Sequence, residues 1–87
     1  MEPGRIVFSK AGRDKLKPFV VVSSEADDVY LADGKTRLLH KPKKKKLKHI
    51  QPTNASAEDI RHKLENNKYL NDSDLRKALL PYCLHIN

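Results

Sequence analysis

The fold is decided first by residues 5–23, which read RIVFSKAGRDKLKPFVVVS. Two short apolar runs, residues 6–8 and 19–23, are rich in β-branched and aromatic side chains, and the polar stretch between them contains a glycine. Such runs are typical of strands. The pattern therefore predicts two strands joined by a loop over residues 9–17.

Working outward, three further short strands are predicted within residues 29–50, which read VYLADGKTRLLHKPKKKKLKHI. Apolar runs at 29–31 and 37–40 lie on either side of Asp33-Gly34, a pair that favours a hairpin because the turn needs positive φ. Residues 47–50 are the fifth candidate strand. Short strands with frequent turns indicate a sandwich or barrel, and in a chain of this length closure into a small barrel is the economical way to hide the strand edges.

After Pro52 the pattern changes to helical spacing. A first helix is predicted to begin with Ser56 as its cap and to stop at Asn66-Asn67, with acidic residues in the first turn where they favour the helix dipole. Its apolar face consists of Ala57, Ile60 and Leu64. The spacing of these residues is that of a helix with one buried side.

A second, shorter helix is predicted to begin with Asn71 or Asp72 as its cap and to end at Leu80, because Pro81 follows. Its apolar face consists of Leu75, Ala78 and Leu79. Both helices are too short to persist alone, so their apolar faces must pack on each other, on the barrel or on a partner. The predicted class is mainly β, a small five-stranded barrel followed by two short C-terminal α-helices.

Positive charge is concentrated in the N-terminal part of the chain. The protein has 87 residues and a net charge of +7. Residues 1–50 carry thirteen Lys and Arg against six Asp and Glu, a net +7, whereas residues 51–87 carry five against five. Such asymmetry on a small scaffold favours nucleic-acid binding, since each contacted phosphate releases counterions. The alternative is that the lysine run is a solvated connector without a specific role.

The predicted nucleic-acid contacts form two groups. One surrounds the first loop and consists of Arg5, Lys10, Arg13, Lys15 and Lys17. The other is the lysine run and consists of Lys41, Lys43, Lys44, Lys45, Lys46 and Lys48. Arg37, with Arg5 and Arg13, is a candidate for a fork-shaped contact to phosphate or guanine. A lysine ammonium is a point charge, whereas two-point reading of a base edge favours a guanidinium group. The run is therefore expected to anchor the backbone of a folded RNA and not to read its sequence.

The aromatic residues are expected to serve packing more than base stacking. Phe8 and Phe19 lie in apolar strands and are predicted to be core residues. Tyr30 stands between two apolar neighbours that share the opposite face of a strand, so its ring is a candidate for outward stacking. Tyr69 and Tyr82 are predicted to seal the packing of the helices.

The sequence does not contain the patterns that catalysis or metal binding requires. Four dispersed histidines and one pair, Cys83 with His85, fall short of the four ligands of a structural zinc. A glycine-rich phosphate loop and a set of nucleophile, base and acid are both missing. We therefore expect no enzyme activity, cofactor, metal or small-molecule substrate. The single cysteine and the absence of a long apolar segment predict a cytoplasmic protein without membrane contact.

Residues 4–15, GRIVFSKAGRDK, followed by FVVV at 19–22, resemble a KOW motif, in which one glycine opens a strand and a second forms the turn into the next. The continuation, YLADGK at 30–35 and KKLKHIQPTN at 45–54, is similar to short bacterial KOW-domain RNA-binding proteins, which are related to KOW-type large-subunit ribosomal proteins of archaea and eukaryotes. The resemblance implies an SH3-like five-stranded barrel over residues 1–54 that binds RNA, and a helical extension over residues 55–87. Leu16 departs from the motif, which usually carries a glycine at that position.

Three functions of different classes follow from these observations. The leading one is an RNA-binding module that docks on structured RNA, above all ribosomal RNA, with ribosomal proteins as possible neighbours. The second is a protein-interaction barrel that contacts the ribosomal or transcription machinery through its helices. The third is a DNA-associated architectural protein, which needs only the same basic patch. Salt-dependent binding to folded RNA, measured against duplex DNA, separates the three.

Overall fold

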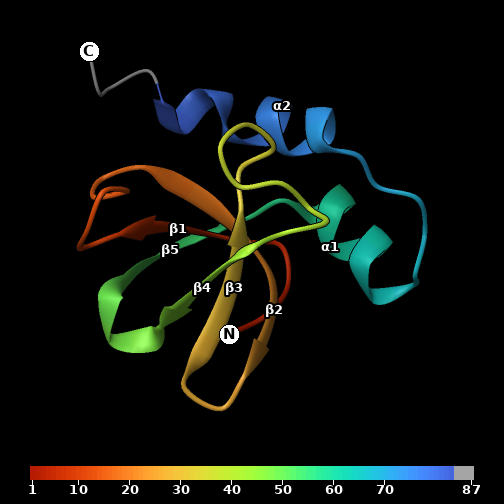
Figure 1. Cartoon of the computed structure of the whole chain (residues 1–87). Coiled ribbons are helices and arrows are strands. Elements are labelled where there is room, and N and C mark those ends of the chain that lie inside the picture. Colours follow the sequence, from red (N-terminus) through yellow and green to blue (C-terminus); the bar gives the residue numbers. More distant parts are fainter. Residues whose placement is uncertain (84–87) are drawn as a thin grey trace.

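Five strands, one short 3-10 helix and two α-helices follow one another in the computed structural model, which describes residues 1–83 (Figure 1). The strands are β1 (Arg5–Ser9), β2 (Pro18–Glu25), β3 (Asp28–Ala32), β4 (Lys43–Lys46) and β5 (Ile50–Ser56). The helices are the 3-10 helix η1 (Leu47–His49), α1 (Glu58–Glu65) and α2 (Asp72–Cys83). The prediction of a mainly β chain followed by two short helices is confirmed.

All five strands belong to one antiparallel sheet with the order β4-β3-β2-β1-β5. Strands that are neighbours in the chain pair with one another from β1 to β4, and β5 returns to pair with the free side of β1. The edge strands are β4 and β5, and within residues 1–83 no ladder of hydrogen bonds joins them. The structure therefore shows an open five-stranded sheet, in which η1 is the direct link between the two edges.

Two of the predicted strands are wrong. Residues 37–40 lie in the long loop between β3 and β4, and residues 47–49 form η1, so that the fifth strand begins only at Ile50. The fourth strand is instead the lysine run, which pairs with β3 from Lys43 opposite Leu31 to Lys46 opposite Asp28. Lysine has a low intrinsic preference for strands, but the exposed edge of β3 supplies a partner, and pairing outweighs propensity.

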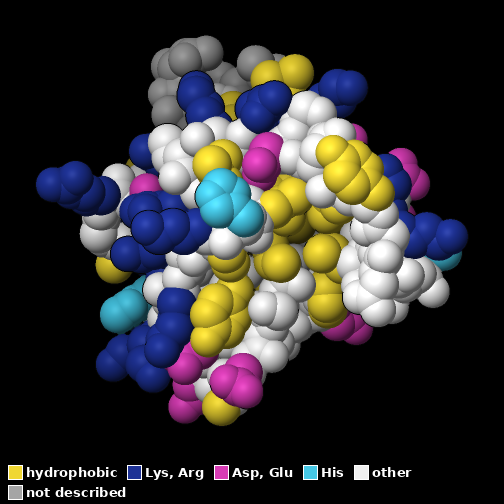
Figure 2. Space-filling model, turned by 45° about the vertical axis from the view of Figure 1, so that its right-hand side comes forward, with side chains coloured by type: hydrophobic (Ala, Val, Ile, Leu, Met, Phe, Trp, Pro, Cys, Tyr) yellow, Lys and Arg dark blue, Asp and Glu magenta, His cyan; other side chains and the backbone are white. Residues whose placement is uncertain are grey.

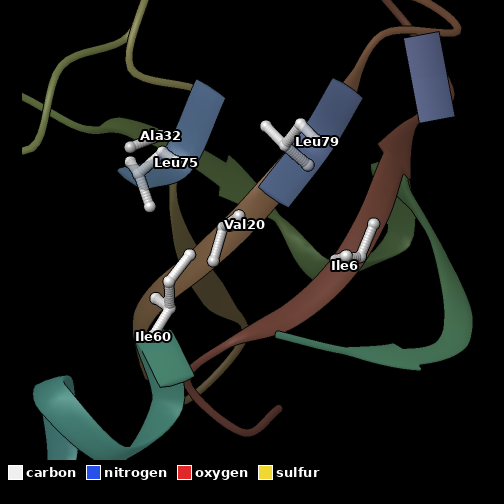
Figure 3. Close-up of a cluster of buried hydrophobic side chains, with 6 residues drawn as sticks. All are labelled: Ile6, Val20, Ala32, Ile60, Leu75 and Leu79. Atoms are coloured by element: carbon white, nitrogen blue, oxygen red, sulfur yellow. The ribbon is translucent and has the colours of Figure 1, made fainter. Parts of the chain in front are cut away.

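The sheet buries apolar side chains on both of its faces. One cluster consists of Val7, Phe19, Val21, Val29, Leu31 and Ile50, all from strands. The other joins three sheet residues to three helix residues and consists of Ile6, Val20, Ala32, Ile60, Leu75 and Leu79 (Figure 3). Consecutive strand residues point to opposite faces, which is why Ile6 and Val7 lie in different clusters. Of the three packing possibilities for the helices, the structure shows that they pack on the sheet.

The observed ends of the helices agree only in part with the ends predicted from the sequence. Asn71 caps α2 as predicted, because its Oδ1 accepts a hydrogen bond from the Asp74 N–H at 3.1 Å while the Asp74 carboxylate accepts one from the Asn71 N–H at 3.2 Å. The cap position of α1 is Ala57 without a side-chain hydrogen bond, so the prediction of Ser56 as cap is wrong. The end of α2 at Leu80 is also wrong: the helix passes through Pro81 to Cys83, where Tyr82 packs against the second cluster.

The predictions for the aromatic side chains are likewise confirmed for some residues and wrong for others. Phe19 is fully buried, as predicted, whereas Phe8 is half-buried and belongs to neither cluster. Tyr82 of α2 packs against the cluster shared by sheet and helices, as expected. Tyr69 is 82% exposed because it lies in the connection between the two helices and not on a helical face. Tyr30 is half-buried between two fully buried neighbours, as strand alternation requires.

Candidate nucleic-acid interface

Strand β4 divides the lysine run into two pairs of side chains. Directly opposed residues of an antiparallel pair lie on the same face of the sheet. Lys43 and Lys45 are opposite Leu31 and Val29, so they share the face of the strand-only cluster. The other two lysines, at positions 44 and 46, are opposite Tyr30 and Asp28 and occupy the reverse face. The run is therefore two surfaces and not one.

The reverse face is partly neutralised by a carboxylate. Asp28 lies 3.0 Å from the Lys46 ammonium and 3.9 Å from that of Lys44. The hydrogen bond and the negative charge of Asp28 raise the pKa of the Lys46 ammonium. One carboxylate thus lies beside two ammonium groups, so the three groups together keep one positive charge that can attract an outside anion.

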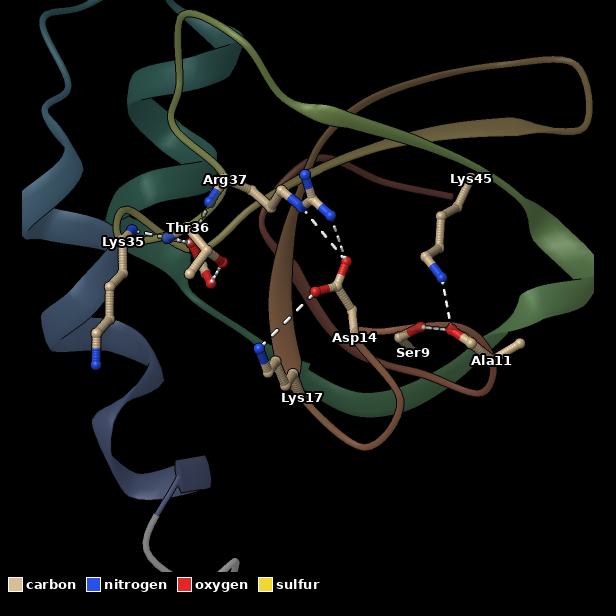
Figure 4. Close-up of polar contacts among 9 residues, drawn as sticks. Ser9, Ala11, Asp14, Lys17, Lys35, Thr36, Arg37 and Lys45 are labelled. Atoms are coloured by element: carbon tan, nitrogen blue, oxygen red, sulfur yellow. Dashed lines mark hydrogen bonds and ion pairs between the residues drawn. The ribbon is translucent and has the colours of Figure 1, made fainter.

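The other face is joined to the first loop, residues 10–17. The Lys45 ammonium donates a hydrogen bond of 2.8 Å to the carbonyl oxygen of Ala11 (Figure 4). Beside it the Lys10 N–H donates a bond of 2.8 Å to the carbonyl oxygen of His49 in η1. These contacts bring together the two groups of cations that the sequence leaves as separate segments.

A buried carboxylate fixes the other side of this loop. The side chain of Asp14 is 6% exposed, and it accepts hydrogen bonds from Arg37 Nη2 at 3.0 Å and Nε at 3.3 Å. The Lys17 ammonium lies 3.9 Å from the same carboxylate (Figure 4). Both Arg37 bonds end on the same oxygen, Oδ2, and hydrogen bonds between oppositely charged groups are stronger than those between neutral groups. Arg37 therefore holds the first loop against the loop between β3 and β4, whereas the Lys17 ion pair lies within the first loop.

The backbone of the first loop contains two residues in the left-handed region. Gly12 has φ of 79°, as its predicted turn role requires, and Leu16 has φ of 70°. A side chain built at Gly12 would meet only the Lys45 ammonium, at 3.6 Å, so glycine is needed there for its backbone conformation and not for space.

The loop between β3 and β4 is organised by Asp33. Its Oδ1 accepts hydrogen bonds from the N–H groups of Lys35, Thr36 and Arg37 at 2.8 to 2.9 Å, and its Oδ2 accepts one from the Thr36 hydroxyl at 2.8 Å. Burial raises the pKa of this carboxyl group, but the hydrogen bonds to the charged form outweigh it, so that the pKa lies below its ordinary value. The turn thereby places Arg37 where it meets Asp14.

The predicted contact residues now fall into two sets. Six are exposed and have no side-chain partner within residues 1–83, namely Lys10, Arg13, Lys15, Lys41, Lys43 and Lys48. The others make contacts within the protein, namely Arg5, Lys17, Arg37, Lys44, Lys45 and Lys46. Arg5 is apart from the loop, since its Nη1 donates to the carbonyl oxygen of Thr53 on β5 at 3.1 Å.

Part of the free set borders a hollow in the surface. It is lined by residues of the loop before β4 and of β4 itself, namely Thr36, Arg37, Leu38, His40, Lys41, Pro42, Lys43 and Lys44. Figure 2 shows Lys and Arg side chains gathered on the left of the view, beside an apolar area in its middle. Except for Leu38 and Pro42, every lining side chain can donate a hydrogen bond, and none is acidic. The hollow therefore suits an anion such as a phosphate group.

Sequence reasoning overlooked the acidic residues that organise this surface. Asp14 stands between Arg13 and Lys15, and Asp28 is the second residue of an acidic pair and the first residue of β3. An isolated carboxylate inside a basic loop is the signal that points to such a role. Lys35 was also passed over, although it is exposed beside the Asp33 turn.

No known family model matches the chain, and no curated protein resembles it closely enough to count as a match. Within residues 1–83 no three His, Cys, Asp or Glu side chains come together as a metal site would need, and His85 lies outside the described residues. None of the helices in that same part of the chain has the length and apolar character to span a membrane.

Proposed function

We propose that the protein is a non-catalytic, cytoplasmic RNA-binding module that docks on the phosphate groups of structured RNA, ribosomal RNA above all. The contact surface consists of the first loop, the loop before β4, the exposed lysines of β4, and η1. The proposal includes a KOW-type identity and an SH3-like barrel. The return of β5 to β1 supports a barrel, because it brings the fifth strand back to the start of the meander.

The observation that carries the proposal is the junction between the two cationic segments. Lys45 and Arg37 connect β4 and the loop before it to the first loop through Ala11 and Asp14. The charged groups of Lys45 and Arg37 make contacts within the protein. The free cations lie in the same segments: the first loop, the loop before β4, β4 and η1. A polyanion therefore meets cationic segments that the fold has already brought together, so binding does not have to assemble the two segments.

The chemistry of the free set favours phosphate over base edges. Five of its six members are lysines, which bind as point charges, and Arg13 is the single guanidinium group among them. RNA helices and junctions present clustered phosphates that a small basic module can bridge, whereas the deep major groove of RNA is closed to side chains. The module is thus expected to recognise RNA shape.

Two double variants with equal loss of charge test the proposal. Lys43→Ala with Lys48→Ala removes free cations from the surface, and Lys68→Ala with Lys77→Ala removes two exposed lysines from the helical part. Binding to a folded ribosomal RNA fragment is measured by fluorescence anisotropy over a range of salt concentrations. We expect the first pair to weaken binding and to reduce the salt slope by about one unit per lysine.

The helical pair is expected to leave the slope nearly unchanged. Equal effects of both pairs would mean that net charge alone attracts RNA and would contradict a defined surface. A duplex DNA of the same length serves as competitor, and stronger competition by DNA than by RNA would favour the architectural class instead.

A further inference from the structure

We infer that Leu16 is a contact residue of the RNA-binding surface, and that its side chain packs against an unpaired nucleotide next to the anchored phosphates. The inference rests on the proposed function and adds to it a class of RNA. The preferred ligand is a helix with a bulged or otherwise unstacked base, and not a perfect duplex.

The backbone of Leu16 is the first observation. Its φ of 70° lies in the left-handed region, which a leucine side chain disfavours. Hydrogen bonds hold the residue there, because the Leu16 N–H donates to the Ser9 carbonyl oxygen at 2.8 Å and the Lys17 N–H donates to that of Asp14 at 3.0 Å. Both bonds use backbone atoms only. A glycine would adopt the same conformation without the strain.

The side chain of Leu16 makes no apolar packing within residues 1–83 that would compensate for the strain of its backbone. It is 64% exposed and belongs to neither of the apolar clusters. An exposed leucine in this conformation is strained in comparison with glycine and gains little from burial. Strain that the fold does not need is a recognised mark of a functional position.

The surroundings of Leu16 indicate the chemistry of its partner. Lys15 precedes it and is exposed without a side-chain partner within residues 1–83, and Lys10 and Arg13 of the same loop are equally free. The apolar side chain of Leu16, with these three cations in the same loop, is complementary to a ligand that presents phosphate groups next to the apolar face of a ring. In a continuous RNA helix the ring faces are stacked and hidden, so one unstacked base is needed.

The test compares a blunt RNA duplex of about twenty base pairs with the same duplex carrying one unpaired adenosine. Wild-type protein, Leu16→Gly and Leu80→Ala are measured with both RNAs. Leu80 is the matched control, because it is an exposed leucine on α2 at 60% exposure. Leu16→Asn is a second variant, since asparagine tolerates the left-handed region.

We expect wild-type protein to bind the bulged duplex about tenfold more tightly than the blunt one, as burial of most of a leucine side chain allows. Both Leu16 variants should lose this preference while keeping the affinity for the blunt duplex and its salt slope. Leu80→Ala should keep the preference. The unfolding midpoint of Leu16→Gly should be equal to or higher than that of the wild type.

Equal binding of wild-type protein to both RNAs would overturn the inference and leave the proposed function standing. A preference that survives in Leu16→Gly, or an equal loss of affinity for both RNAs, would also overturn it, the second because it would show a role in loop structure alone. Failure of wild-type protein to bind either RNA would overturn the proposed function itself.

Discussion

At the scale of single residues, Asp33 makes the stability of the loop between β3 and β4 depend on pH. The three N–H groups and the hydroxyl that it binds favour its charged form and lower its pKa below the ordinary value of 3.8. A carboxyl group with a lowered pKa in the folded state stabilises the fold fully above its unfolded pKa. This contribution is lost as pH falls through the folded pKa.

Asp33→Asn separates this effect from that of the other carboxyl groups. Near neutral pH the variant should be less stable by about 1 kcal/mol, because an amide oxygen replaces a charged acceptor. Between pH of about 5 and about 3 the wild type should lose stability faster than the variant, so that the two converge. Urea unfolding at several pH values measures the difference. A constant difference across that range would show that Asp33 does not titrate with folding.

The turns at Gly12 and at Asp33-Gly34 show how much of the local structure a short motif predicts. Positive φ at Gly12 and Gly34 follows from the turn chemistry of the sequence and is found in the structure. The hairpin predicted from Asp33-Gly34 is wrong, because the carboxylate closes a wider loop. A Cβ at Gly34 would collide with the carbonyl oxygen of Asp72 in α2, a contact between residues far apart in the chain. Sequence alone gives no sign of that neighbour.

At the scale of elements, β4 shows why the lysine run was misread. Composition suggests a loop or a connector, whereas its ladder with β3 makes it a strand with two different faces. The period of two then decides which lysines meet Asp28 and which meet the first loop. The first three strands and the presence of both helices were predictable from local patterns, whereas the fourth and fifth strands were not. The edges of the strands were not predictable either, because they depend on pairing between distant segments.

Asp28→Asn tests whether the carboxylate of Asp28 withholds the charges of Lys44 and Lys46 from RNA. The change should free the ammonium groups of Lys44 and Lys46 and strengthen binding to the folded ribosomal RNA fragment by a few-fold, with a salt slope steeper by about one unit. Stability should fall by no more than about 1 kcal/mol, since ion pairs with exposed lysines contribute little. Anisotropy titrations at several salt concentrations measure the affinity and the slope.

The control for this change is Glu65→Gln at the end of α1, which alters net charge by the same amount away from the surface. We expect it to change RNA affinity less than Asp28→Asn does. If both variants gain equally, the carboxylate of Asp28 has no special relation to the lysines of β4.

At the scale of the whole molecule, the sheet and the helices share one apolar cluster. Ile6 and Val20 of the sheet are covered by Leu75 and Leu79 of α2 and by Ile60 of α1 (Figure 3). Without the helices this face of the sheet would be an exposed apolar surface. Both helices contribute to this one cluster and so cover the same face of the sheet, and the sheet that carries the basic surface also carries the helical part.

Leu75→Ala tests whether that scaffold unfolds as one unit. Leu75 is fully buried, and its truncation should cost about 2 to 5 kcal/mol. If sheet and helices are cooperative, hydrogen exchange at the amides of Ile6 and Val20 should accelerate together with exchange in α2, and denaturant unfolding should remain a single transition. Leu80 is an exposed leucine on the same helix, and Leu80→Ala should change stability by less than about 0.5 kcal/mol.

Rapid exchange confined to α2, with the amides of β1 and β2 still protected, would show instead that the sheet is stable without its helices. In that case the five-stranded sheet would be a folding unit by itself, and the RNA surface would be independent of the helices that follow it.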